Sequence, residues 1–79
     1  MRIRVRYFAL FREQAGLSEE EVDTDAATAG DLYEELRERH GFALPASHIR
    51  AAVNLEFRAM EERIAEGDVV TFIPPVAGG

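Results

Sequence analysis

The sequence contains no cysteine, which excludes disulfides, thiolate nucleophiles and thiolate metal ligands together. Lysine is also absent, because all nine basic residues are arginine. The chain therefore has no side-chain amine that could accept an acyl group. Only two histidines are present, His40 and His48, and no third residue has the spacing of a metal ligand. We expect neither a metal site nor a bound cofactor.

Motifs of conventional enzymes are missing too. There is no glycine-rich phosphate loop and no nucleophile elbow, and paired carboxylates such as Glu61 and Glu62 are typical of a solvated face. We therefore expect no catalysis by this chain alone. Arginines interrupt the early apolar run and no run is long enough to cross a bilayer, so we expect a cytoplasmic protein. A net charge of −6 disfavours nucleic acid or membrane as the main partner.

The 79 residues allow a single small domain. Residues 2–8 alternate as a half-buried strand does, with Ile3, Val5 and Tyr7 on one face. Phe8 falls on the other face. It either tucks beneath the end of a strand that stops at Tyr7, or it is an exposed aromatic side chain awaiting a partner. The alternation alone does not separate these two interpretations.

Helix and turn signals follow. Residues 9–15 predict one or two helical turns closed by Gly16, with Leu10 and Phe11 toward the core. Residues 18–25 predict a short acidic strand at a sheet edge. The clearest helix begins after a capping Thr28 and ends before Gly41, and Phe42 is expected to fold back on it.

The second half predicts mostly strands. After a loop at residues 43–49, residues 50–58 predict a strand, a tight turn and a short return that leaves Phe57 exposed. Ile64 is expected to enter the core from a loop, before a turn at Gly67 and Asp68. Residues 69–73 predict a last strand. On that strand Val70 and Phe72 share one face, and Val69, Thr71 and Ile73 share the other.

This order predicts an α+β protein with a mixed four- to five-stranded sheet packed against one main helix. With the first and last strands adjacent in the centre, it is the β-grasp arrangement of ubiquitin-like proteins. Residues 1–73 would form the domain, and residues 74–79 a flexible tail that ends in Gly-Gly.

The tail is the least ordinary stretch. Pro74 and Pro75 cannot donate hydrogen bonds, so they end the sheet and favour an extended exit. Six extended residues reach roughly 20 Å. Glycines lack a Cβ, so Gly78 and Gly79 could pass through a channel too narrow for side chains. A carboxylate at Gly79 would need activation, which an acyl-adenylate would provide, and attack by sulfur would leave a terminal thiocarboxylate.

The chain resembles, over its whole length, the small subunits of molybdopterin synthases, which are sulfur carriers of the ubiquitin-like superfamily. The specific parts are the tail, Phe-Ile-Pro-Pro-Val-Ala-Gly-Gly, and the Gly67-Asp68 turn. Compatible parts are Tyr7-Phe8-Ala9, Arg12-Glu13, Gly16, Ala52-Val53-Asn54 and Val69-Val70.

The resemblance implies that an adenylating enzyme of the ubiquitin-activating (E1-like) type uses ATP on Gly79, and that a sulfur donor protein makes the thiocarboxylate. Pro74, Pro75, Val76, Ala77 and Gly78 would thread into the large subunit, which supplies the catalytic side chains. Sulfur would pass to cyclic pyranopterin monophosphate to form the molybdopterin dithiolene. The implied assembly has two small and two large subunits.

The same resemblance implies an apolar docking surface at Phe8, Phe57 and Ile73, which favours the exposed interpretation of Phe8. Many members have an aromatic residue where Ile73 stands, so this contact differs here. Alternative functions are a sulfur carrier for thiamine thiazole or for tRNA thiolation, a ubiquitin-like protein modifier, or a structural protein without chemistry at its end.

Overall fold

The computed structural model describes residues 1–75, and Val76 to Gly79 lie outside the described residues. The described part forms, in chain order, β1 (Arg2–Tyr7), α1 (Ala9–Ala15), β2 (Glu19–Asp23), α2 (Ala29–His40), a 3₁₀ turn (Ala46–His48), β3 (Arg50–Val53), β4 (Glu56–Arg58) and β5 (Val69–Ile73). No helix among these residues is both long and apolar enough to cross a membrane.

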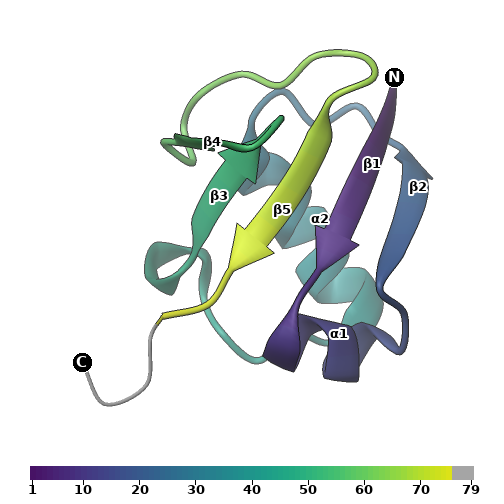
Figure 1. Ribbon diagram of the computed structural model, residues 1–79, viewed down its shortest axis with the longest axis vertical. Helices are drawn as coiled ribbons and strands as arrows, with labels where there is room; N and C mark the ends of the chain where they lie inside the picture. The colour runs from purple at the N-terminus through teal and green to yellow at the C-terminus, as the bar shows by residue number, and fades with distance from the viewer. Residues whose placement is uncertain (76–79) are drawn as a thin grey trace.

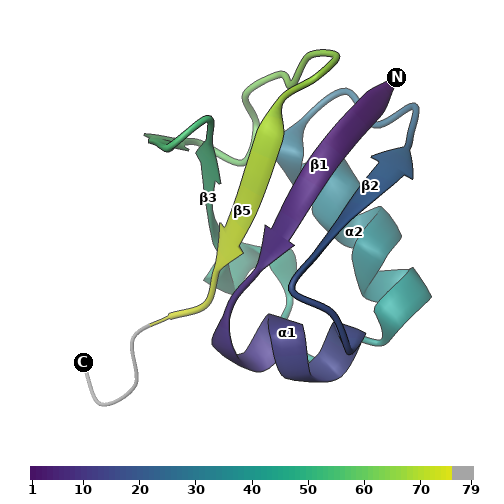
Figure 2. The ribbon, with the colours of Figure 1, turned by 45° about the vertical axis from the view of Figure 1, so that its right-hand side comes forward.

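The strands form one mixed five-stranded sheet in the order β2-β1-β5-β3-β4. β1 and β5 are parallel neighbours in its centre, and the other three pairings are antiparallel. Figures 1 and 2 show that α2 crosses one face of this sheet, while the opposite face carries no helix. The predicted β-grasp architecture is confirmed, with the first and last strands side by side.

The core lies between α2 and the sheet. Ile3, Val5 and Tyr7 of β1 are buried, as their alternation predicts, and Val70 and Phe72 of β5 lie beside them. Leu32, Tyr33 and Leu36 close the core from α2. Aromatic rings meet edge to face at its centre, for example Tyr33 and Phe72 with centroids 5.2 Å apart.

Local signals explain where the helices begin and end. The Thr28 hydroxyl accepts a hydrogen bond from the Asp31 N–H at 3.0 Å, which satisfies one free donor of the first turn of α2. Gly41 then ends α2 in the left-handed region, with φ +74°, where residues with a Cβ are strained. Phe42 folds back into the core, as predicted.

One detail differs from the sequence predictions, and a second was not predicted. Phe11 is buried, but Leu10 stays partly exposed outside the core cluster, because successive residues of the short α1 point about 100° apart and only one faces inward. Thr71 is also buried although it faces away from α2, because it is flanked in register by Arg6 and Ala52 on the neighbouring strands.

A polar cluster joins β1, β2 and α2 at the margin of the core. The Tyr7 hydroxyl donates to Glu20 Oε2 at 2.5 Å, and His40 Nε2 lies 2.6 Å from the same oxygen. Burial alone would raise the pKa of Glu20, but hydrogen bonds from Tyr7 and His40 and the positive charges of His40 and Arg39 outweigh it and hold this pKa below its ordinary value. Glu20 therefore stabilises the folded state above its unfolded pKa, and this contribution is lost as the pH falls through the folded pKa.

Replacing Glu20 by Gln should lower the free energy of unfolding by about 1 kcal/mol at neutral pH, and by much less at a pH below the folded-state pKa of Glu20, where the carboxylate is protonated in both states. Urea unfolding at the two pH values measures this difference. Glu19→Gln is the matched control, because Glu19 makes only exposed ion pairs with Arg4 and Arg6. An equal effect of Glu20→Gln at both pH values would contradict the assigned role.

Candidate functional site

The candidate site is the root of the C-terminal tail. β5 ends at Ile73, whose register partner is Arg50 of β3, and Pro74 and Pro75 follow without regular structure. Neither proline has an N–H for the sheet ladder, so the strand cannot continue through them. Pro74 is half-buried and Pro75 is exposed. Figure 1 shows the chain leaving the sheet at the end where β1 runs into α1.

The other predicted tail residues are Val76, Ala77, Gly78 and Gly79. They lie outside the described residues, so their threading and the chemistry at Gly79 stay predictions.

The three predicted docking residues surround this exit. Phe8 directly follows β1 and is 48% exposed, with the Arg6 guanidinium 5.6 Å from its ring centroid. Tyr7 pairs with Phe72 as the last pair of the β1–β5 register, so Phe8 and Ile73 both follow it at the same end of the sheet. Phe57 lies in the edge strand β4 and is 74% exposed, while Ile73 is half-buried. Phe8 and Phe57 are thus exposed aromatic side chains on either side of β5.

Phe57 and Ile73 also share a groove with the tail root. This groove has a volume of about 540 Å³, and Pro74, Pro75 and Met60 add further apolar walls. Phe8 does not line the groove, because β5 separates it from β4. The structure therefore brings two of the three docking residues together at the start of the tail and places the third on its other side.

Ion pairs between β1 and β2 occupy the half of the helix-free sheet face that lies away from β3 and β4. Arg4 of β1 lies 2.8 Å from Glu19 and 3.3 Å from Glu21 of β2, and Arg2 and Arg6 also approach acidic side chains of β2. These exposed pairs neutralise the arginines of β1 and make the β2 edge strand polar. The two most exposed large apolar side chains of the described residues, Leu55 and Phe57, lie instead in the β3–β4 turn and in β4.

Some residues of this region were missed by sequence reasoning. His48 and Arg50 line the groove at the tail root, and Leu55 is 87% exposed in the β3–β4 turn. Leu55 has φ +72°, a left-handed value that is unusual for a leucine. The exposure of Arg50 could have been predicted from the sequence, because Arg50 alternates with the apolar Ala51 on a predicted strand.

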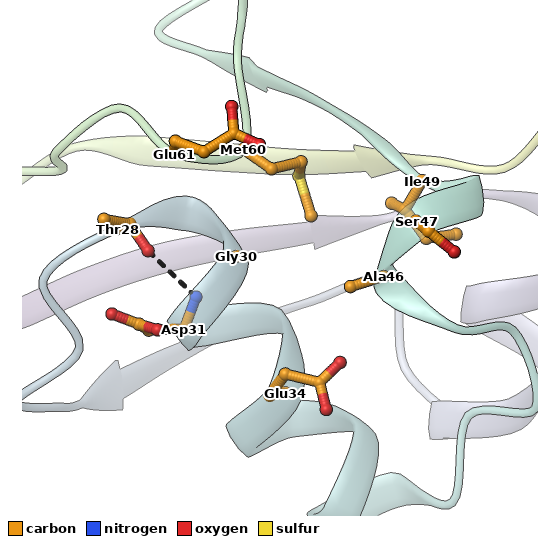
Figure 3. A pocket seen from close by; sticks show the side chains of 9 residues that line it. All are labelled: Thr28, Gly30, Asp31, Glu34, Ala46, Ser47, Ile49, Met60 and Glu61. Atoms are coloured by element: carbon orange, nitrogen blue, oxygen red, sulfur yellow. Dashed lines mark hydrogen bonds between the residues drawn. The ribbon is translucent and has the colours of Figure 1, made fainter.

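A second groove of about 570 Å³ lies between the start of α2 and the segment after β4 (Figure 3). Met60, Ala46 and Ile49 supply apolar surface, and Asp31, Glu34 and Glu61 supply negative charge. Within residues 1–75, no group of three or more histidine and acidic residues is arranged to hold a metal ion. This groove holds none of the predicted site residues.

Comparisons with a family model and with known proteins point to the same protein family. A family model described as the ThiS family matches residues 5–79. The molybdopterin synthase sulfur carrier subunit of Escherichia coli (strain K12) is 35% identical over 80 residues, which cover 98% of this chain and 99% of that protein.

Two solved structures share the fold. SAMP1 from Haloferax volcanii superposes with a TM-score of 0.80 at 32% identity, with both chains covered completely. A complex of subunits 1 and 2 of molybdopterin-converting factor from Helicobacter pylori 26695 contains a chain with a TM-score of 0.66, covering 100% of each chain, and its 24% identity supports the fold alone.

Proposed function

Because the chain belongs to the ThiS family, we propose that it is the sulfur-carrier subunit of a molybdopterin synthase. The observation that carries this proposal is the full-length similarity to the Escherichia coli sulfur carrier subunit. The position of the tail supports it, because the strand that leads to Pro74 and Pro75 is in the centre of the sheet and pairs with β1 on one side and β3 on the other.

The proposed chemistry takes place at the carboxylate of Gly79. One carboxylate oxygen attacks the α-phosphorus of ATP on an adenylating enzyme, pyrophosphate leaves, and an acyl-adenylate forms. Hydrosulfide delivered by a donor protein then attacks the acyl carbon with its lone pair, the acyl–phosphate bond breaks, AMP leaves, and loss of the S–H proton gives a thiocarboxylate. The tail carries this sulfur into the large subunit, where the sulfur bonds to a carbon of cyclic pyranopterin monophosphate and water cleaves the acyl–sulfur bond, which regenerates the Gly79 carboxylate. Two such transfers complete the dithiolene.

In the proposed assembly of two small and two large subunits, Phe8, Phe57 and Ile73 rest on the large subunit. Their place supports this role, because exposed aromatic side chains flanking a tail exit would lose water on docking and would fix the direction in which the tail enters. Their apolar contacts also suit an interface whose centre is depleted of charge.

Replacing Phe57 by Arg should weaken binding to the large subunit by about 100-fold or more, since a buried aromatic contact becomes a desolvated charge. Phe8→Arg should act in the same direction. Because both rings are exposed, the thermal midpoint should change little. Calorimetric titration with the large subunit measures the affinity. A large loss of thermal stability in either variant would instead make the residue part of the core.

Intact-mass spectrometry tests the carrier function itself. After incubation with ATP, an adenylating enzyme and a sulfur donor, the chain should gain the mass difference between one sulfur and one oxygen. Adding the large subunit and the pterin precursor should discharge this sulfur and form the dithiolene product. A different outcome is a chain that carries the thiocarboxylate sulfur, keeps it under these conditions, and donates it in thiazole formation or in tRNA thiolation. That outcome would assign the chain to one of those pathways instead.

A protein modifier is the second candidate, favoured by the close superposition on SAMP1, since another structure of the Haloferax volcanii protein is described as small archaeal modifier protein 1. In that function, the activated Gly79 would form an amide with a lysine of another protein. The lysine-free sequence has a consequence here, because no copy of this chain could be attached to a side-chain amine of another copy. Conjugates would therefore contain no copies linked to one another through lysine side chains.

A further inference from the structure

The groove at the tail root differs in charge from the rest of the molecule. Eleven described residues line it, and none is acidic, although the chain has 15 acidic residues. Its rim instead carries His48, Arg50 and Arg58. On a protein with a net charge of −6, this is a local concentration of basic side chains around apolar walls.

Two arginines line this groove, and within the described part of the chain only one of them forms ion pairs with acidic side chains. Arg58 lies 3.2 Å from Glu62 and 3.4 Å from Glu56. Arg50 is exposed and makes no ion pair with any of residues 1–75. The groove therefore presents one uncompensated guanidinium.

The register places this charge beside the apolar contact. Arg50 is the cross-strand partner of Ile73 in the antiparallel β3–β5 pair, so both side chains leave the same face of the sheet. Phe57 reaches the groove from β4, where its register partner is Ala52. A molecule that covers Phe57 and Ile73 must therefore also meet Arg50.

Two further grooves of residues 1–75 have the opposite character. The groove at the start of α2 is lined by Asp31, Glu34 and Glu61 and by no basic side chain. Another groove is lined by Asp23, Asp25 and Glu35, with Met1 and Thr24 beside them and no arginine or histidine in its lining. The charge around the tail root is thus a local property and not a general one.

We propose that the groove at the tail root receives an apolar side chain of the large subunit, with a neighbouring carboxylate of that subunit paired to Arg50. This inference rests on the proposed function for the identity of the partner and adds the chemistry of the segment that binds. A guanidinium left unpaired on a buried interface costs binding energy, so a docked partner has to supply an anion there. A charge pair next to the tail root also fixes how the domain is rotated on the large subunit. Apolar contacts alone define this orientation weakly.

Charge reversal at Arg50 tests the proposal. Arg50→Glu should weaken binding of the full-length chain to the large subunit by at least about tenfold at low salt, since it places two carboxylates opposite each other. Arg63→Glu is the matched control, because Arg63 is also exposed and makes no ion pair within residues 1–75 but lies outside the groove. It should change the affinity by less than about twofold.

The salt dependence supplies a second measurement. Between low and physiological ionic strength, the affinity of the unaltered chain should fall more steeply than that of Arg50→Gln, because neutralising Arg50 removes the screened attraction. Equal effects of Arg50→Glu and Arg63→Glu would overturn the proposal while leaving the sulfur-carrier function intact. If the unaltered chain binds no large subunit at all, the proposed function fails, and this inference fails with it.

The tail of the same chain is the competing occupant. If residues 76–79 filled the groove and their terminal carboxylate paired with Arg50, deleting them would shift the amide resonances of Arg50, Phe57 and Ala59 in the isolated protein. We expect these three resonances to stay in place. Shifts there, combined with tighter binding of the partner after the deletion, would overturn the proposal in favour of a self-occupied groove.

Discussion

Deleting Gly79 is expected to reduce sulfur transfer to the background of the assay and to leave the thermal midpoint unchanged. The deletion removes no residue of the core, but it moves the terminal carboxylate one residue back along the tail. Shortening an extended chain by one residue withdraws its end by about 3.5 Å, and a displacement of that size breaks the geometry that acyl activation requires. Intact-mass measurement of thiocarboxylate formation gives the result directly.

Adding one alanine after Gly79 is the control for this experiment. The variant lengthened by one alanine keeps every residue of the tail but lacks a free carboxylate on Gly79, so it should also fail to gain sulfur. Both variants should still bind the large subunit through the folded domain. A variant without Gly79 that acquires sulfur at the normal rate would show that the carrier group lies elsewhere.

Replacing Phe72 by Ala is expected to lower the free energy of unfolding by about 3–5 kcal/mol, a large part of the stability of so small a domain. Phe72 has no exposed surface, lies edge to face with Tyr33, and stands between Tyr7 and Ala51 in the sheet. No neighbouring side chain can fill the volume of the lost ring without moving the backbone of a central strand.

Phe57→Ala is the matched control, since the same atoms are removed from a ring that is 74% exposed. It should change the free energy of unfolding by less than about 0.5 kcal/mol. Chemical denaturation of both variants gives the two values. The pair also separates the functions of two rings on opposite faces of the sheet, because Phe72 fixes the strand that leads to the tail and Phe57 is assigned to the docking surface. Similar losses in both variants would contradict the distinction.

Most of the fold follows from simple patterns in the sequence. The alternation of Ile3, Val5 and Tyr7 identifies a strand and its buried face, and the same period in β5 separates Val70 and Phe72 from Ile73. The glycines at 16 and 41 and the cap at Thr28 identify helix ends because each satisfies a backbone requirement locally.

What the sequence could not supply was the contact between distant segments. The burial of Thr71 depends on Arg6 and Ala52, which come from two other strands. The groove at the tail root is lined by residues of the 3₁₀ turn, β3, β4 and the end of β5, so no single stretch of sequence predicts it. Arg50 becomes notable only when its pairing with Ile73 and the lack of a nearby carboxylate are known.

The central place of β5 also has a consequence for biosynthesis. Every other element precedes β5 in the chain, yet β1 and β3 both need it as a neighbour. During translation, the sheet therefore stays open in its middle until the last strand leaves the ribosome, and the pairing of β1 with β5 must close a loop that spans most of the chain. A polypeptide released early would expose two unpaired strand edges and apolar core residues, which are features that chaperones and proteases recognise. Competence to fold thus arises only when the segment that leads to the tail has been made.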